Sequence, residues 1–154
     1  MARYFGYDVI TDAKAKLVAD LNTNITTINS TRSTACPVVR AFRSNWTENQ
    51  FPVCYIDLGD SEVENNENEL NNDIELEVEH YELEVTIEHK SNKKPEIFGL
   101  EMEIFEEAIS KTLHGYYNAG ILWCIKTNTA RVDVSTQENQ TKKMVTVIFD
   151  VKVR

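Results

Sequence analysis

Residues 74–89 read Ile74-Glu-Leu-Glu-Val-Glu-His-Tyr-Glu-Leu-Glu-Val-Thr-Ile-Glu-His89 in this chain of 154 residues. Apolar residues alternate with glutamates, and this period of two predicts a β-strand with one buried and one solvated face. The alternation changes phase at His80-Tyr81, which is typical of a β-bulge. Upstream, residues 51–58 predict a partner strand that ends at the turn signal Gly59-Asp60. The two strands predict a long hairpin over residues 51–90, with residues 62–73 as its polar tip.

Two amphipathic helices and four more strands complete the expected fold. Apolar residues recur every three or four positions between residues 7 and 28, and the Asn- and Thr-rich sequence beyond predicts that this helix ends near Asn29. A second helix should begin at Pro95 and end before Gly115. Its apolar stripe comprises Ile97, Leu100 or Glu101, Ile104, Phe105, Ala108 and Leu113. The other strands are expected at residues 35–42, 120–126, 130–136 and 143–153.

The order α-β-β-β-α-β-β-β predicts a single α+β domain over residues 1–154. We expect two layers, with both helices packed on one face of an antiparallel or mixed sheet. Cys36, Cys54 and Cys124 are widely spaced, so reduced core cysteines are expected. The longest apolar run, residues 119–125, is far too short to cross a bilayer, and the N-terminal residues lack the apolar segment of a secretory signal. We therefore expect no membrane partner and assembly in a cytoplasm.

Charge is strongly segregated along the chain, whose formal net charge is −9. Fourteen of the 25 acidic residues, and no Lys or Arg, lie between Ser44 and His89. Such asymmetry indicates a partner or a passage more often than it reflects a fold. Five glutamates of the long strand are therefore candidate interface or channel-facing residues, although they could equally form the solvated face of an antiparallel sheet. These candidates are Glu75, Glu77, Glu79, Glu82 and Glu84.

Motifs for catalysis or cofactor binding are weak in this sequence. Asp73, Glu88 and Lys90 are spaced as in metal-dependent nucleases, in which two acids hold Mg²⁺ and a lysine stabilises phosphate charge. However, Glu-x-Lys arises readily on a glutamate-rich strand, and the acidic flanks would repel nucleic acid. The histidines and cysteines have no zinc spacing, and no phosphate-binding glycine loop or nucleophile elbow is present. We expect no metal, no cofactor and no enzymatic activity.

Aromatic residues supply a second set of interface candidates, because aromatics provide much of the contact energy at protein interfaces. Trp46 lies among Ser44, Asn45 and Thr47 in a segment that should be a loop, and it is the better candidate. Trp123 lies in an apolar strand, so we expect it in the core.

In the order of its elements and the sequence pattern of its strands, the chain resembles the tail-terminator, or tail-completion, proteins of long-tailed bacteriophages and related tail-like particles. The resemblance covers nearly the whole chain: an amphipathic first helix, Phe51-Pro-Val-Cys-Tyr-Ile-Asp-Leu58, a polar loop, Tyr81-Glu-Leu-Glu-Val-Thr-Ile-Glu88, a second helix, and Val145-Thr-Val-Ile-Phe-Asp-Val-Lys-Val153. It rests on element order rather than on any diagnostic residue, and the loop at residues 62–73 is longer than the pattern needs.

The resemblance implies a virion structural protein that caps the finished tail tube as a ring, usually of six subunits. Such a ring joins the tube, and possibly a sheath, to the neck or connector proteins, and it leaves a channel through which genomic DNA passes without specific binding. An acidic wall suits this passage, because each cationic contact would add affinity for phosphates. The alternatives are another neck protein, such as a head-completion or connector protein, the Mg-dependent nuclease, and an acidic module that imitates DNA toward a basic partner.

Overall fold

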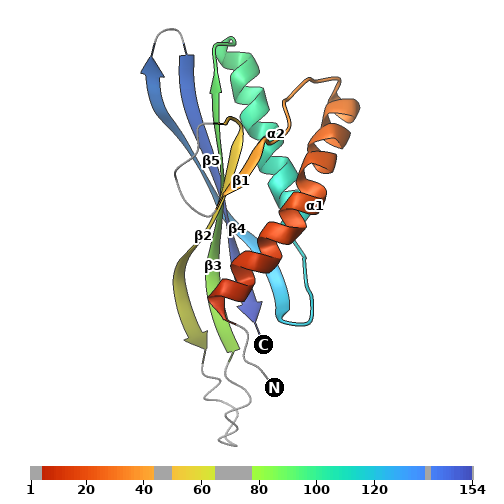
Figure 1. The fold of residues 1–154 in the computed structure, drawn as a ribbon, viewed down its shortest axis with the longest axis vertical. Coiled ribbons are helices and arrows are strands. Elements are labelled where there is room, and N and C mark those ends of the chain that lie inside the picture. Colours follow the sequence, from red (N-terminus) through yellow and green to blue (C-terminus); the bar gives the residue numbers. More distant parts are fainter. Residues whose placement is uncertain (1–4, 44–49, 65–77, 138–139, 154) are drawn as a thin grey trace, which may run out of the picture.

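The computed structural model describes residues 5–43, 50–64, 78–137 and 140–153. Within these residues the elements are α1 (Gly6–Arg32), β1 (Ala41–Arg43), β2 (Val53–Glu64), β3 (Val78–Ser91), α2 (Pro95–Leu113), β4 (Ile121–Gln137) and β5 (Gln140–Val153). The strands form one sheet in the order β1-β2-β3-β5-β4. β1 pairs with β2 in parallel, and the other pairs are antiparallel. Both helices lie on one face of this sheet (Figure 1), which confirms the two-layer α+β fold with a mixed sheet.

The long hairpin of β2 and β3 is confirmed, but its irregularity lies in β2. β3 pairs with β5 residue for residue from Glu79 to Ser91, so the bulge expected at His80-Tyr81 is wrong. Instead, the β2 ladder places both Gly59 and Asp60 opposite the single residue Glu82. Gly59-Asp60, expected to be a turn, is therefore a bulge inside a strand that continues to Glu64.

The unbroken ladder of β3 fixes the directions of its side chains. Leu83, Val85 and Ile87 are buried against the helices, and the residues between them face the other side of the sheet. Glu82 and Glu84 are on that outer face, but Glu79 has the parity of the buried residues. The single glutamate face that was expected is therefore divided between the two sides of the sheet. Glu75 and Glu77 lie outside the described residues.

Helix α1 continues to Arg32, beyond the end expected near Asn29. The side chains of Thr11, Thr26, Thr27 and Thr31 each donate a hydrogen bond of 2.9–3.1 Å to the carbonyl four residues earlier. Their hydroxyls are thereby satisfied without interrupting the helix. Burial of an apolar stripe that extends to Ile25 and Ile28 outweighs the weak helix propensity of this stretch.

Asparagine side chains hold the segment that follows α1. Asn29 donates to the Cys36 carbonyl at 2.8 Å and accepts from the Cys36 N–H at 2.9 Å. Asn22 bonds both backbone groups of Val39 in the same way, at 3.0 and 2.8 Å. These side chains bond the backbone groups that a neighbouring strand would otherwise bond. The strand expected at residues 35–42 is therefore found only as β1, at Ala41–Arg43.

β4 is one strand where two were expected. It follows β5 along its whole length with three register shifts, and one of these falls at Thr127, where a turn was expected. Glu106 of α2 accepts hydrogen bonds from Arg131 at 2.5 Å and Lys126 at 3.3 Å, which fastens the helix to this strand. Burial alone would raise the pKa of Glu106, but these hydrogen bonds lower it overall.

The hydrophobic core lies between the helices and the sheet. The expected stripe of α1 is buried from Ala13 to Ile28, whereas its first member Ile10 is only partly buried; Ile104, Phe105 and Leu113 of α2 are buried. Ile97, however, is 45% exposed, and Phe98 occupies the core in its place. The three cysteines are buried and unpaired, as expected. Burial raises the pKa of Cys36 and of Cys124 to about 12, so neither is a reactive thiolate at neutral pH.

Candidate interaction surface

The outer face of the sheet lies on the side away from α1 and α2 (Figure 1), and it carries Glu82 and Glu84 of the predicted interface residues. Near β1 this face has a small apolar cluster in which Ala41, Val53 and Tyr55 are buried. The part formed by β3, β5 and β4 is more polar and more exposed. The chemistry of the surface is therefore decided by the side chains that alternate away from the core on these three strands.

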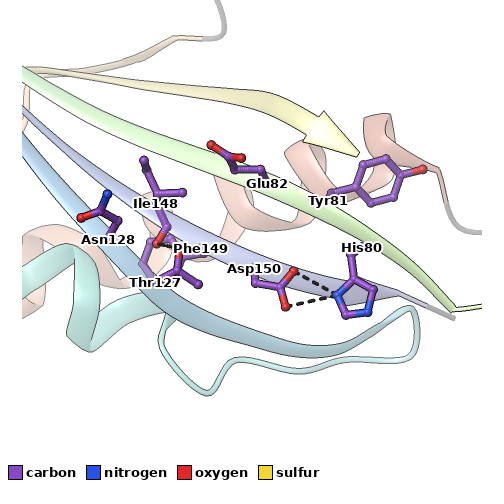
Figure 2. Close-up of a pocket in the computed structure, with 8 residues that line it drawn as sticks. All are labelled: His80, Tyr81, Glu82, Thr127, Asn128, Ile148, Phe149 and Asp150. Atoms are coloured by element: carbon purple, nitrogen blue, oxygen red, sulfur yellow. Dashed lines mark hydrogen bonds and ion pairs between the residues drawn. The ribbon is translucent and has the colours of Figure 1, made fainter. Parts of the chain in front are cut away.

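A hollow of about 390 Å³ lies on this outer face (Figure 2). It is lined by His80, Tyr81, Glu82, Thr127, Asn128, Ile148, Phe149 and Asp150. Nδ1 of His80 is 3.0 and 3.1 Å from the two carboxylate oxygens of Asp150. The hydroxyl of Thr127 donates to the Ile148 carbonyl at 3.2 Å. The lining thus combines anionic and neutral polar groups with an aliphatic wall, a composition suited to receiving a polar or cationic side chain.

Trp123 and Lys152 extend this polar cluster toward β4. The Trp123 Nε1–H donates to Asp150 at 3.4 Å, and the Lys152 Nζ lies 4.3 Å from the centre of a Trp123 ring. Trp123 was expected in the core, but it is 39% exposed on the outer face. Trp46, for which an interface role was expected, lies outside the described part of the chain. Trp123 is therefore the tryptophan of the described surface.

Acidic side chains oppose one another across the outer face. Asp57 of β2 is directly opposite Glu84 of β3, and Glu82 is directly opposite Asp150 of β5. The bulge brings the backbone close to these groups, since a Cβ at Gly59 would lie 3.2 Å from the Glu82 carboxyl and 3.3 Å from that of Glu84. Like charges directly opposite each other destabilise a sheet.

The edge strand β4 adds apolar surface next to the acidic residues. Leu122 is 38% exposed, Ile125 39% and Val132 54%. An aromatic and aliphatic edge beside a polar face is typical of protein interfaces. The register shifts of β4 interrupt its outer edge, which disfavours a long continuous strand pairing with another molecule. Contact through side chains is therefore favoured here over extension of the sheet.

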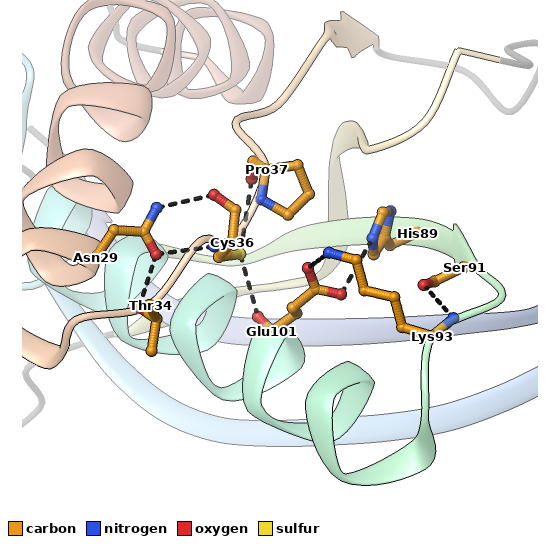
Figure 3. Close-up of polar contacts among 8 residues, drawn as sticks. All are labelled: Asn29, Thr34, Cys36, Pro37, His89, Ser91, Lys93 and Glu101. Atoms are coloured by element: carbon orange, nitrogen blue, oxygen red, sulfur yellow. Dashed lines mark hydrogen bonds and ion pairs between the residues drawn. The ribbon is translucent and has the colours of Figure 1, made fainter.

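A second polar cluster is buried on the helix side of the sheet (Figure 3). The Glu101 carboxylate is 2.7 Å from Lys93 Nζ and 3.6 Å from Nε2 of His89. Burial lowers the pKa of His89, although the Glu101 carboxylate acts in the opposite direction. A hollow of about 240 Å³ beside Glu101 and Lys93 reaches Cys36. Glu101 was one of two possibilities for the apolar stripe of α2, and it occupies that buried position as an ion-paired acid.

Of the three residues of the nuclease alternative, the structure describes Glu88 and Lys90. Glu88 is buried and pairs with Lys142 at 2.7 Å, so a cation already occupies its carboxylate. Lys90 is exposed, and Asp73 lies outside the described residues. Among the residues that the structure describes, no group of three or more His, Cys, Asp or Glu side chains is arranged to hold a metal ion.

Sequence reasoning missed the contacts among His80, Trp123, Asp150 and Lys152. These residues come from three strands, and His80 and Asp150 are 70 positions apart, so no spacing motif could connect them. The one available signal was the alternation of the last strand, which places Asp150 and Lys152 between buried residues.

Comparisons with known proteins give structural likenesses but no match in sequence. No protein-family model matches the chain, and no curated protein has a similar sequence. A chain from the structure of the virion of a native gene transfer agent particle is similar, with a TM-score of 0.49 and 12% identity, over 89% of this chain and 93% of that chain. Of the helices described here, neither is long and apolar enough to cross a membrane.

Proposed function

We propose that this chain is a structural virion assembly protein of a phage or phage-like particle. It caps the tail tube as a ring of six subunits and forms the joint between the tube and the head-side neck. Its partners are other copies of itself, the tail tube and any sheath, and the neck or connector proteins. It acts by matching surfaces and has no catalytic turnover. The resemblance of its element order to tail-terminator proteins is the starting point of this proposal.

The observation that carries the proposal is the composition of the outer face. Trp123 and Ile125 are each 39% exposed beside the carboxylates of Glu82 and Asp150. Exposed aromatic and aliphatic residues contribute strongly to protein interfaces, whereas acidic neighbours disfavour contact with DNA phosphates. The surface therefore fits a protein partner and does not attract the nucleic acid that passes through the particle.

An acidic surface also suits a channel for DNA. Non-specific affinity for DNA is mostly counterion release by Lys and Arg, and carboxylates provide none of it. Glu82 and Glu84 are not buried and share the outer face, so they could line such a channel or meet a basic neighbour. In either position they exclude phosphates from the joint.

Electron microscopy of the purified chain, alone and mixed with tail tubes of the same particle, tests the proposal. We expect rings of uniform diameter and their presence at one end of each tube, with native mass spectrometry giving six copies. Trp123→Ala combined with Ile125→Ser should abolish the rings while circular dichroism stays unchanged. Tyr117→Ala, at an exposed site in the connection between α2 and β4, is the control and should assemble normally. A protein that stays monomeric with tubes present would overturn the proposal.

A further inference from the structure

We propose that copies of this chain contact one another through two oppositely charged surfaces, the acidic patch and the lysine corner. The acidic patch consists of Asp57, Glu82 and Glu84 on the outer face. The lysine corner consists of Lys90 at the end of β3 and of Lys93 and Lys94 before α2. The acidic patch of one copy receives the lysine corner of the next. The inference rests on the proposed function in that a ring needs a contact of this head-to-tail kind.

The lysine corner concentrates positive charge at one end of the sheet. Lys90, Lys93 and Lys94 lie within five residues, and β5 places Lys142 opposite Lys90 and Lys143 opposite His89. Lys93 is paired with Glu101 and Lys142 with Glu88. Lys90 and Lys94 are exposed, and neither has an ion pair within the described residues. These two ammonium groups are the available cations of the corner.

The acidic patch lies on the same sheet, near the middle of β3. Asp57 and Glu84 face each other across the β2–β3 pair, and Glu82 is next on the same side of β3. The three carboxylates make this part of the face anionic, so charge complementarity favours a lysine-bearing partner.

The two surfaces cannot neutralise each other within one molecule. Glu84 and Glu82 are six and eight residues of unbroken strand from Lys90, which at about 3.3 Å per residue places them about 20 and 26 Å from it. Screening at physiological salt acts over about 8 Å. β3 is paired on both sides, so it does not fold back to close this distance. A second copy is the partner that supplies both surfaces in equal number.

Paired charge reversals test this contact. The acid variant carries Glu82→Lys and Glu84→Lys, and the lysine variant carries Lys90→Glu and Lys94→Glu. Sedimentation and native mass spectrometry should show that each variant alone loses assembly, with a dissociation constant raised at least about a hundredfold, because like charges then meet. An equal mixture of the two variants should restore assembly, and so should the chain that carries all four changes. Assembly of the natural chain should weaken between 50 and about 500 mM salt.

The matched control reverses Glu103→Lys and Lys111→Glu, both exposed on α2, and should assemble normally. Unchanged assembly of either reversed variant, or no recovery on mixing, overturns the contact. Normal assembly of the lysine variant with lost binding to duplex DNA would assign the corner to nucleic acid and also overturn it. Restored assembly as closed dimers would support the contact but contradict the ring, so the two proposals can fail separately.

Discussion

His89 ends the buried side of β3, where its ring packs edge-on against Phe98 and Phe105 at 5.3 and 5.6 Å between centroids. Neither ring nitrogen makes a hydrogen bond to the described residues, and Oε1 of Glu101 lies 3.6 Å from Nε2. A neutral imidazole fits this apolar site, because burial penalises its charged form. The residue is therefore a packed ring that resists protonation.

The buried His89 should make stability depend on pH. Its pKa in the folded protein is below the ordinary value of 6.5, so the unfolded chain takes up the proton first as pH falls. The free energy of unfolding should therefore decrease as pH falls below 6.5. His89→Phe should flatten this decrease in urea titrations at several pH values. An identical pH dependence in His89→Phe would contradict the assignment.

At the scale of elements, the connection between α1 and β1 depends on two asparagines on the same face of the helix. Asn22 and Asn29 are seven positions apart, which is two turns, so both point toward the same extended segment. Each satisfies one N–H and one C=O of that segment. Without them these backbone groups would need another strand or water.

Removing either asparagine should loosen this connection. Asn22→Ala and Asn29→Ala should each lower the free energy of unfolding by about 1–3 kcal/mol, because two partly buried backbone groups lose their partners. Thr27→Ala, on the exposed side of α1, is the control and should have little effect or stabilise slightly through helix propensity. Thermal unfolding and amide exchange of Cys36 and Val39 measure the change. Unaltered protection of these two amides would contradict the role of the asparagines.

The elements also mark the limits of what the sequence could predict. The buried stripes of α1 and β5 and the long hairpin followed from periodicity, because their apolar faces are continuous. The bulge was misplaced because the apolar phase of residues 74–78 was carried into β3, whose pairing with β5 begins only at Glu79. A turn at Thr127-Asn128 and a bulge there have similar composition, and only the partner strand distinguishes them.

At the scale of the whole molecule, charge is arranged along the sheet rather than spread over the surface. The acidic patch lies near the middle of β3 and the lysine corner at its end, and the apolar edge of β4 runs beside them. The charge excess between residues 44 and 89 was evident from sequence, but its division between two faces depends on strand register. The contacts of Asp150 with His80 and Trp123 required the folded sheet, since three strands supply them.

The like charges of the acidic patch should lower the free energy of unfolding of the single chain while they favour assembly. Asp57→Asn keeps the acceptor that bonds the Leu58 N–H at 2.8 Å but removes the charge opposite Glu84. We expect the free energy of unfolding to rise by about 0.2–1 kcal/mol while self-association weakens. Glu103→Gln, an exposed change on α2, should alter neither quantity. A variant that is no more stable than the natural chain would contradict the repulsion.

The position of the bulge in β2, rather than in β3, determines where the chain tolerates a change in length. β3 has neighbours on both sides, so one residue inserted or deleted within it would turn Glu82 and Glu84 inward and Leu83 and Val85 outward. β2 already accommodates one surplus residue at Gly59-Asp60, and its loss would leave a regular ladder. Over evolutionary time, natural variants should therefore gain or lose residues beside Gly59 and keep the span of β3 constant.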